Sequence, residues 1–318
     1  MKKGYLYHRV ITVAWLMAGV GGFGALLTVL LRVWLSPSLR DIDTGLYTTN
    51  TAVIVLMLVL LALLGLGAWL ARGGSRCEIG GKPSLALSMV SLAVGAALTL
   101  FGGAEILSRL GVISFGTAAV SFVDAQSVNT TLQWLQSVFC LLGGVALARF
   151  GLSLASEGVT RRGMAQWSLL APVLWVWFSL TNYEMSYASM VRLSDGFFTL
   201  MMYITEMMFL FIFARYVAGV GKVDNVVLLF FSSAATLFAL SAPVARLLMY
   251  LLQDGAAFAA AGAAGLSDLA VGVLALTVSI TLCQSLSASA VRESEEDVWM
   301  PPVSRVDLVE SFDDAIEE

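Results

Sequence analysis

Eight long apolar segments dominate this sequence, and each has the length needed to cross a lipid bilayer. A spanning helix needs about 20 mainly apolar residues. We place the segments at residues 9–34, 51–71, 84–107, 131–154, 165–182, 193–217, 226–252 and 267–287. Only 13 % of the residues are charged, which is too few to coat a water-soluble protein of 318 residues. The sequence therefore predicts an all-α, polytopic integral membrane bundle of eight transmembrane helices in the lipid bilayer.

The positive charges alternate between the two sides of the predicted bundle. Of the 18 Lys and Arg residues, 13 fall on one side, 4 fall on the other, and Arg246 lies within the seventh segment. Lys and Arg are enriched in cytoplasmic loops. This distribution predicts that both termini are cytoplasmic in a plasma membrane, and an even number of spans agrees with that orientation.

The composition changes at about residue 288. Residues 288–318 contain ten acidic side chains and two arginines, a net charge of −8, whereas residues 1–287 carry a net charge of +4. High charge and low hydrophobicity are typical of disordered chain. We therefore expect a transmembrane domain at 1–287 and an acidic, disordered cytoplasmic tail at 288–318. The tail either binds a cytoplasmic protein partner or only keeps the chain soluble.

Glu206 is the most costly residue within the apolar segments, because an ionisable group in lipid is expensive and is a candidate for function. It lies 13 residues after Leu193, about 20 Å along its helix and near the bilayer middle. Thr236 and Thr277 lie at a similar depth, so we expect Glu206 to face hydroxyl donors and to be neutral. Two interpretations stay open. The carboxyl group carries a proton, or it only hydrogen-bonds neighbouring helices.

Arg246 is the second costly residue. It lies 20 residues into the seventh segment, about 30 Å from the inner end and therefore in the outer third of the membrane. Asp195, at the outer start of the sixth segment, is close to it in depth. We expect an Arg246–Asp195 charge pair in the outer leaflet, with snorkelling of Arg246 to the outer headgroups as the alternative.

Several further residues have structural interpretations. Glu105 and Arg109 are spaced to form an i, i+4 pair. Asp268 lies near the outer surface at a helix start, where it suits the positive end of the helix. Pro172 and Pro243 lie inside their segments and are expected to kink them. Small side chains recur at four-residue spacing, for example in the series Ser91, Gly95, Thr99 and Gly103, and predict close approach of helix backbones.

No motif of a known catalytic or metal chemistry is present. His8 is the only histidine, and the three cysteines are scattered, so we expect no enzyme activity, cofactor or metal site. The basic loops are explained by topology, so no nucleic-acid partner is expected. Two functional hypotheses remain. One is a transporter or permease for a small solute or ion, and the other is a scaffold or sensory subunit that binds a cytoplasmic partner through its acidic tail.

Overall fold

The computed structural model describes residues 2–39, 51–71, 84–112, 130–156, 164–187, 193–220, 224–252 and 266–299. Within these ranges the regular structure is entirely helical. The elements are α1 (Lys2–Leu39), α2 (Thr51–Leu70), α3 (Leu85–Arg109), α4 (Thr130–Ser156), the short 3-10 helix η1 (Met164–Leu169), α5 (Leu170–Tyr187), α6 (Leu193–Ala218), α7 (Asn225–Leu252) and α8 (Leu266–Trp299).

Seven of the helices in the described part of the chain are long and apolar enough to cross a membrane. The exception is α5, which has 18 residues and a polar final part that contains Asn182 and Glu184. The segment predicted at 165–182 is divided between η1 and α5. The all-helical, multi-pass class is thus confirmed, but length and composition support seven spans where the sequence predicted eight.

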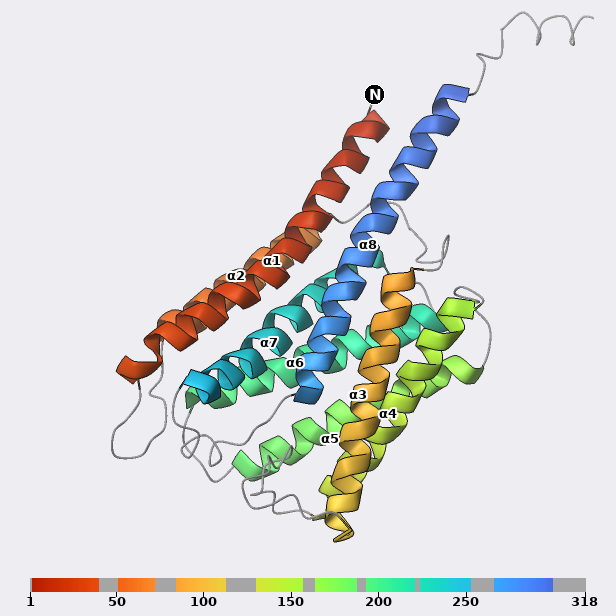
Figure 1. The fold of residues 1–318 in the computed structure, drawn as a ribbon. Coiled ribbons are helices and arrows are strands. Elements are labelled where there is room, and N and C mark those ends of the chain that lie inside the picture. The colour runs from red at the N-terminus through yellow and green to blue at the C-terminus, as the bar shows by residue number, and fades with distance from the viewer. Residues whose placement is uncertain are drawn as a thin grey trace, which may run out of the picture.

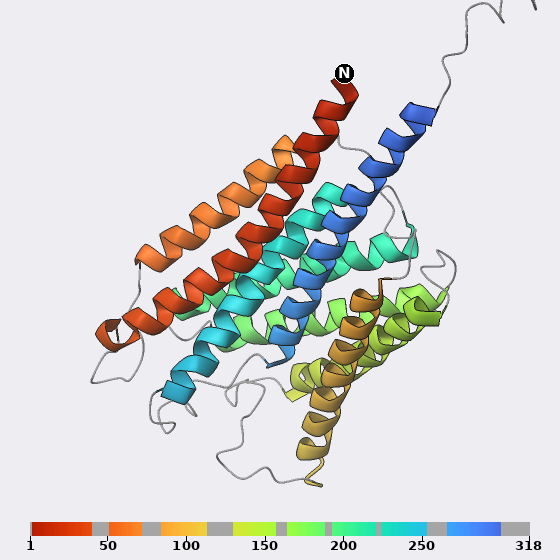
Figure 2. The same ribbon diagram turned by 45° about the horizontal axis from the view of Figure 1, so that its top comes forward.

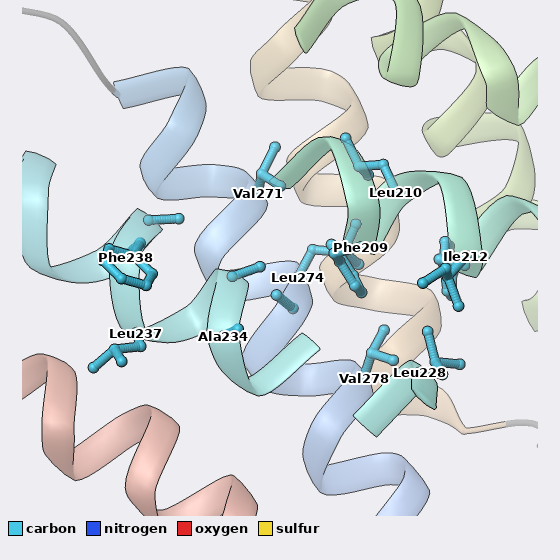
Figure 3. Close-up of a cluster of buried hydrophobic side chains, with 14 of the residues drawn as sticks. Phe209, Leu210, Ile212, Leu228, Ala234, Leu237, Phe238, Val271, Leu274 and Val278 are labelled. Carbon is cyan, nitrogen blue, oxygen red and sulfur yellow. The ribbon is translucent and has the colours of Figure 1, made fainter. Parts of the chain in front are cut away.

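The helix α7 forms the centre of the bundle. In its span, Asn225–Ala245, 72 % of the residues are buried, compared with 17 % in the span of α2. Figures 1 and 2 show α1 and α2 on one flank, α3 and α4 on the other, and α6, α7 and α8 between them. Buried side chains of these three central helices meet in one hydrophobic cluster, which includes Phe209, Phe238 and Leu274 (Figure 3).

The helices α3 and α4 approach each other so closely that several of their glycines cannot carry a side chain. A Cβ atom added to Gly102 would lie 2.6 Å from the backbone nitrogen of Leu141. Gly95 and Gly144 make equally close approaches to the partner backbone. The hydroxyl of Ser88 also donates a hydrogen bond of 2.7 Å to the carbonyl of Gly151 on α4. The close packing predicted from the small side chains of α3 is confirmed.

Pro172 lies in the first turn of α5 and not in the interior of a helix, because α5 begins at Leu170. The first backbone N–H groups of a helix have no intrahelical acceptor, so a proline there costs no hydrogen bond. Pro172 therefore lies just after the change from η1 to α5, and the kink expected in this segment stays a prediction. Pro243 lies inside α7, which is assigned as one helix from Asn225 to Leu252.

The start of α1 and the end of α8 lie at the same end of the bundle (Figure 1). The candidate span of α8 ends at Ser289, and the helix continues to Trp299. It therefore extends beyond residue 287, where the acidic tail is expected to begin. Residues 113–129, 253–265 and 300–318 are among those that lie outside the described residues.

Candidate functional site

Glu206 lies in the interior of the bundle. It is on α6 and its exposed fraction is 0 %. Met202 and Phe209, about one turn away on either side, are also fully buried. Both carboxyl oxygens of Glu206 lack a hydrogen-bond partner within the described part of the chain. A buried polar group without a partner loses its hydration and gains nothing in return, so this position is costly for the fold.

The hydroxyl groups of Thr236 and Thr277 are used within their own helices. Thr236 Oγ1 donates to the carbonyl of Ser232 at 2.8 Å, and Thr277 Oγ1 donates to the carbonyl of Val273 at 2.9 Å. Thr236 is fully buried and Thr277 is half-buried. The structure therefore does not join these three predicted residues into one hydrogen-bonded site, because each threonine hydroxyl satisfies a backbone carbonyl one turn earlier.

A second acidic side chain, Asp268, lies close enough to Glu206 for their carboxyl groups to interact electrostatically. Asp268 is in the first turn of α8 and is 3 % exposed. The sequence places it near the outer surface of the membrane, and the structure shows that it is also covered by neighbouring helices. In Figures 1 and 2, α8 begins beside the middle of α3, so its first turn lies inside the bundle.

Amide and phenol side chains of α4, α5 and α6 also meet in the interior. Asn182 Nδ2 on α5 donates a long hydrogen bond of 3.5 Å to Gln136 Oε1 on α4. The ring of the adjacent residue, Tyr183, packs edge-to-face against the ring of Tyr203 on α6, with centroids 5.9 Å apart. Gln136 and Asn182 are buried and the two tyrosines are partly buried. The hydrogen bond joins the first part of α4 to the end of α5, and the ring contact joins the end of α5 to α6.

Further polar residues of α6 and α8 lie close to these amide and phenol side chains. Tyr203 lies three residues before Glu206 on α6, and Glu206 interacts with Asp268 on α8. Cys140, which lies one turn after Gln136 on α4, is also within the electrostatic range of Asp268. We call six polar residues of α4, α5, α6 and α8 the polar cluster. Two pairs, Gln136–Asn182 and Tyr183–Tyr203, are in contact, and Glu206 and Asp268 lie near them on α6 and α8.

The predicted Arg246–Asp195 pair involves side chains that lie outside the described residues, although both backbones are helical. It therefore stays a prediction. Near the start of α6, the structure instead describes the guanidinium group of Arg32, 4.8 Å from the ring centroid of Phe198. Arg32 is on α1 and is partly buried. This cation–π contact joins α1 to α6 and was not predicted, because no sequence pattern pairs these two helices.

Glu105 and Arg109 form the predicted i, i+4 ion pair at the end of α3. Arg109 Nη1 also donates a hydrogen bond of 2.6 Å to Gln133 Oε1 on α4. The side chains of the ion pair are 18 % and 16 % exposed. The arginine therefore joins two helices, which supports the structural interpretation of this pair.

A separate groove lies between α1, α7 and α8. It has a volume of about 680 Å³ and an apolar lining that includes Trp15, Phe23, Leu240 and Ile280. None of the residues of the polar cluster lines it. Among the described residues, no group of three His, Cys, Asp or Glu side chains is arranged to hold a metal ion.

No protein-family model, curated protein or solved structure matches this chain. The geometry of the polar cluster is therefore the main indication of what the protein does. Sequence reasoning identified Glu206 but missed Gln136, Asn182, Tyr183 and Tyr203. The run Thr181-Asn182-Tyr183, which interrupts an apolar segment, was the available signal for α5.

Proposed function

We propose that the protein is a transporter of a small solute or ion in which Glu206 carries the coupling proton. The observation that carries this proposal is the state of the Glu206 side chain. It is fully buried, and its two carboxyl oxygens lack hydrogen-bond partners in the described part of the chain. The proposed role requires no catalytic chemistry and no cofactor.

This observation supports the interpretation in which the carboxyl group of Glu206 carries a proton. A glutamate that stabilises the bundle does so by hydrogen-bonding a neighbouring helix. Glu206 makes no such bond to any residue that the structure describes. A buried carboxyl group without a donor or a cation favours its neutral form, because the charged form loses too much hydration energy. Such a group binds a proton when it is buried and releases it when water or a cation reaches it, which is the chemistry of a proton-coupled carrier.

The proposed topology has eight spans, with α5 as the eighth, in a plasma membrane with both termini in the cytoplasm. Three observations support it. The helix α5 packs between α4 and α6 within the bundle. The start of α1 and the end of α8 lie at the same end of the bundle (Figure 1). Most Lys and Arg residues fall on the side that this topology makes cytoplasmic.

Transport can be tested with the purified protein in proteoliposomes on a solid-supported membrane. A panel of small solutes is added under an imposed pH gradient, and the transient current is recorded. We expect a solute-dependent current in the wild type and its loss in Glu206→Gln, because the amide cannot exchange a proton. Glu184→Gln is the matched control, since Glu184 is an exposed carboxylate on α5. An unchanged current in Glu206→Gln would exclude Glu206 as the coupling residue.

A second candidate function is a membrane scaffold that binds a cytoplasmic protein through its acidic C-terminal region. The observation that favours it is the extension of α8 from Ser289 to Trp299, about 15 Å past the candidate span. Purification of the full chain beside a variant ending at residue 290 tests this function by mass spectrometry of co-purifying proteins. A stoichiometric partner found only with the full chain supports the scaffold, and a partner retained by the truncated chain rules out the tail as its contact.

A further inference from the structure

We propose that the polar cluster binds a small organic cation with N–H donors, a protonated amine or a guanidinium ion, whose charge is paired with Glu206. This inference rests on the proposed function, because it names the class of solute that the transporter carries. The features that favour such a ligand are the carboxyl oxygens of Glu206, which are unpaired among the described residues, and the aromatic rings of Tyr183 and Tyr203.

The two carboxyl oxygens of Glu206 define what a ligand must supply. Both are buried, and both lack a donor within the described part of the chain. A cation that carries N–H groups supplies a compensating charge and two donors, and a planar guanidinium ion can offer both donors in parallel. A divalent metal ion would need several more oxygen ligands. The described residues contain no cluster of three acidic or other metal-binding side chains to provide them.

The rest of the cluster also suits an organic cation. Tyr203 lies three residues before Glu206 on α6, and its ring meets that of Tyr183 on α5 edge-to-face. Aromatic faces attract ammonium and guanidinium groups. The amide side chains of Gln136 and Asn182 provide oxygen acceptors for further N–H groups. Asp268 is close enough to Glu206 to contribute to the electrostatic potential there.

The cluster is closed in this structure, because Glu206 has no exposed surface. A ligand reaches Glu206 only if the helices around it separate. The contact between Tyr183 on α5 and Tyr203 on α6 lies within the cluster, so we expect it to open when a ligand enters. The helix α5 is the one α-helix of the described chain that does not qualify as an apolar span, so it is the element we expect to move.

Binding and uptake of [14C]guanidinium test this inference separately. Equilibrium binding is measured on the purified full chain in detergent, and uptake is measured in proteoliposomes. We expect saturable binding that falls about 10-fold or more in Glu206→Gln, because a charge-assisted hydrogen bond is lost. Tyr203→Leu should weaken binding several-fold, whereas Tyr203→Phe should preserve it, since phenylalanine retains the aromatic face. The control Glu184→Gln should bind like the wild type.

A competitor distinguishes N–H recognition from general attraction of cations. Tetramethylammonium has the same charge but no N–H donor, so it should displace guanidinium much less effectively than methylammonium does. Equal displacement by tetramethylammonium or by Na⁺ would overturn the inference. Absence of saturable guanidinium binding, together with a Glu206-dependent current for another solute, would overturn this inference and leave the proposed transport function intact. Guanidinium binding without any uptake would support the site and contradict transport.

Discussion

Ser232 on α7 and Ser279 on α8 are joined by a hydrogen bond of 2.7 Å between their hydroxyl oxygens. Both residues are fully buried in the centre of the bundle. Each hydroxyl also lies 3.1 Å from a carbonyl of its own helix, that of Leu229 or of Ala275. A hydroxyl has one proton, so one serine donates to the other while the second donates to its own backbone. This bond fixes the relative positions of the two central helices.

We expect Ser232→Ala and Ser279→Ala each to lower the free energy of unfolding by about 1 kcal/mol. The double variant should reveal a coupling of about 0.6 kcal/mol, the usual value for hydrogen bonds between membrane helices. Equilibrium unfolding in mixed detergent and SDS micelles measures these quantities. Thr277→Val is the control, because the Thr277 hydroxyl bonds within α8. Additive effects of the two serine substitutions would show that the bond does not couple the helices.

The contact between α3 and α4 predicts opposite effects for two neighbouring glycines. A Cβ atom on Gly102 would collide with the backbone of Leu141, whereas one on Gly103 would lie 3.8 Å from a Leu141 side-chain carbon. Gly102→Ala should therefore destabilise the protein by about 1–3 kcal/mol. Gly103→Ala should be neutral or slightly stabilising, because alanine loses less backbone entropy in a helix. Equal unfolding free energies for the two variants would contradict the packing described for this pair.

The Arg32–Phe198 contact should stabilise the association of α1 with α6. The partly buried guanidinium group lies 4.8 Å from the ring centroid, so a double-mutant cycle with Arg32→Met and Phe198→Leu should give a coupling of about 0.5–2 kcal/mol. Arg215 and Phe211 form the comparison pair. They are both exposed, and their separation is 5.8 Å. A coupling no larger than that of the comparison pair would show that the ring of Phe198 contributes only apolar surface.

Reporter fusions can decide the number of spans. With eight spans, the two termini lie on the same side of the membrane, and a C-terminal green fluorescent protein should fluoresce while a C-terminal alkaline phosphatase remains inactive. A topology in which α5 does not cross would place the termini on opposite sides and reverse the two readings for the same N-terminal orientation. The same reporters fused after α4, the fourth span, serve as a reference, because the end of this span lies on the same side of the membrane as the N-terminus in both topologies.

The helices could be predicted from sequence because their signal is local. The third segment was predicted at 84–107, and α3 runs from Leu85 to Arg109. Length and hydrophobicity determine such a helix in lipid, since its backbone groups must be satisfied within it. The Glu105–Arg109 pair was predictable for the same reason, because its spacing belongs to one helix. The division of 165–182 into η1 and α5 was missed, because the role of Pro172 depends on where the α-helix starts.

The polar cluster could not be predicted as a whole, because it depends on which helices are neighbours. Glu206 was identified from the cost of a carboxyl group in lipid, but equal depth alone made Thr236 and Thr277 its expected partners. Depth does not give the direction in which a side chain points around its helix. Asp268 was placed near the outer surface because it lies at a helix start, and its burial could not be predicted because it depends on the helices beside α8, which begins beside the middle of α3.

The glycines at the α3–α4 contact limit how this part of the protein can move. At Gly95, Gly102 and Gly144 one backbone lies directly against the other helix, so no layer of deformable side chains separates them. Sliding one helix along the other would bring larger residues into these positions and force the pair apart. The two helices must therefore translate and rotate together. Any conformational change that opens the bundle then divides the molecule beside this pair and not through it.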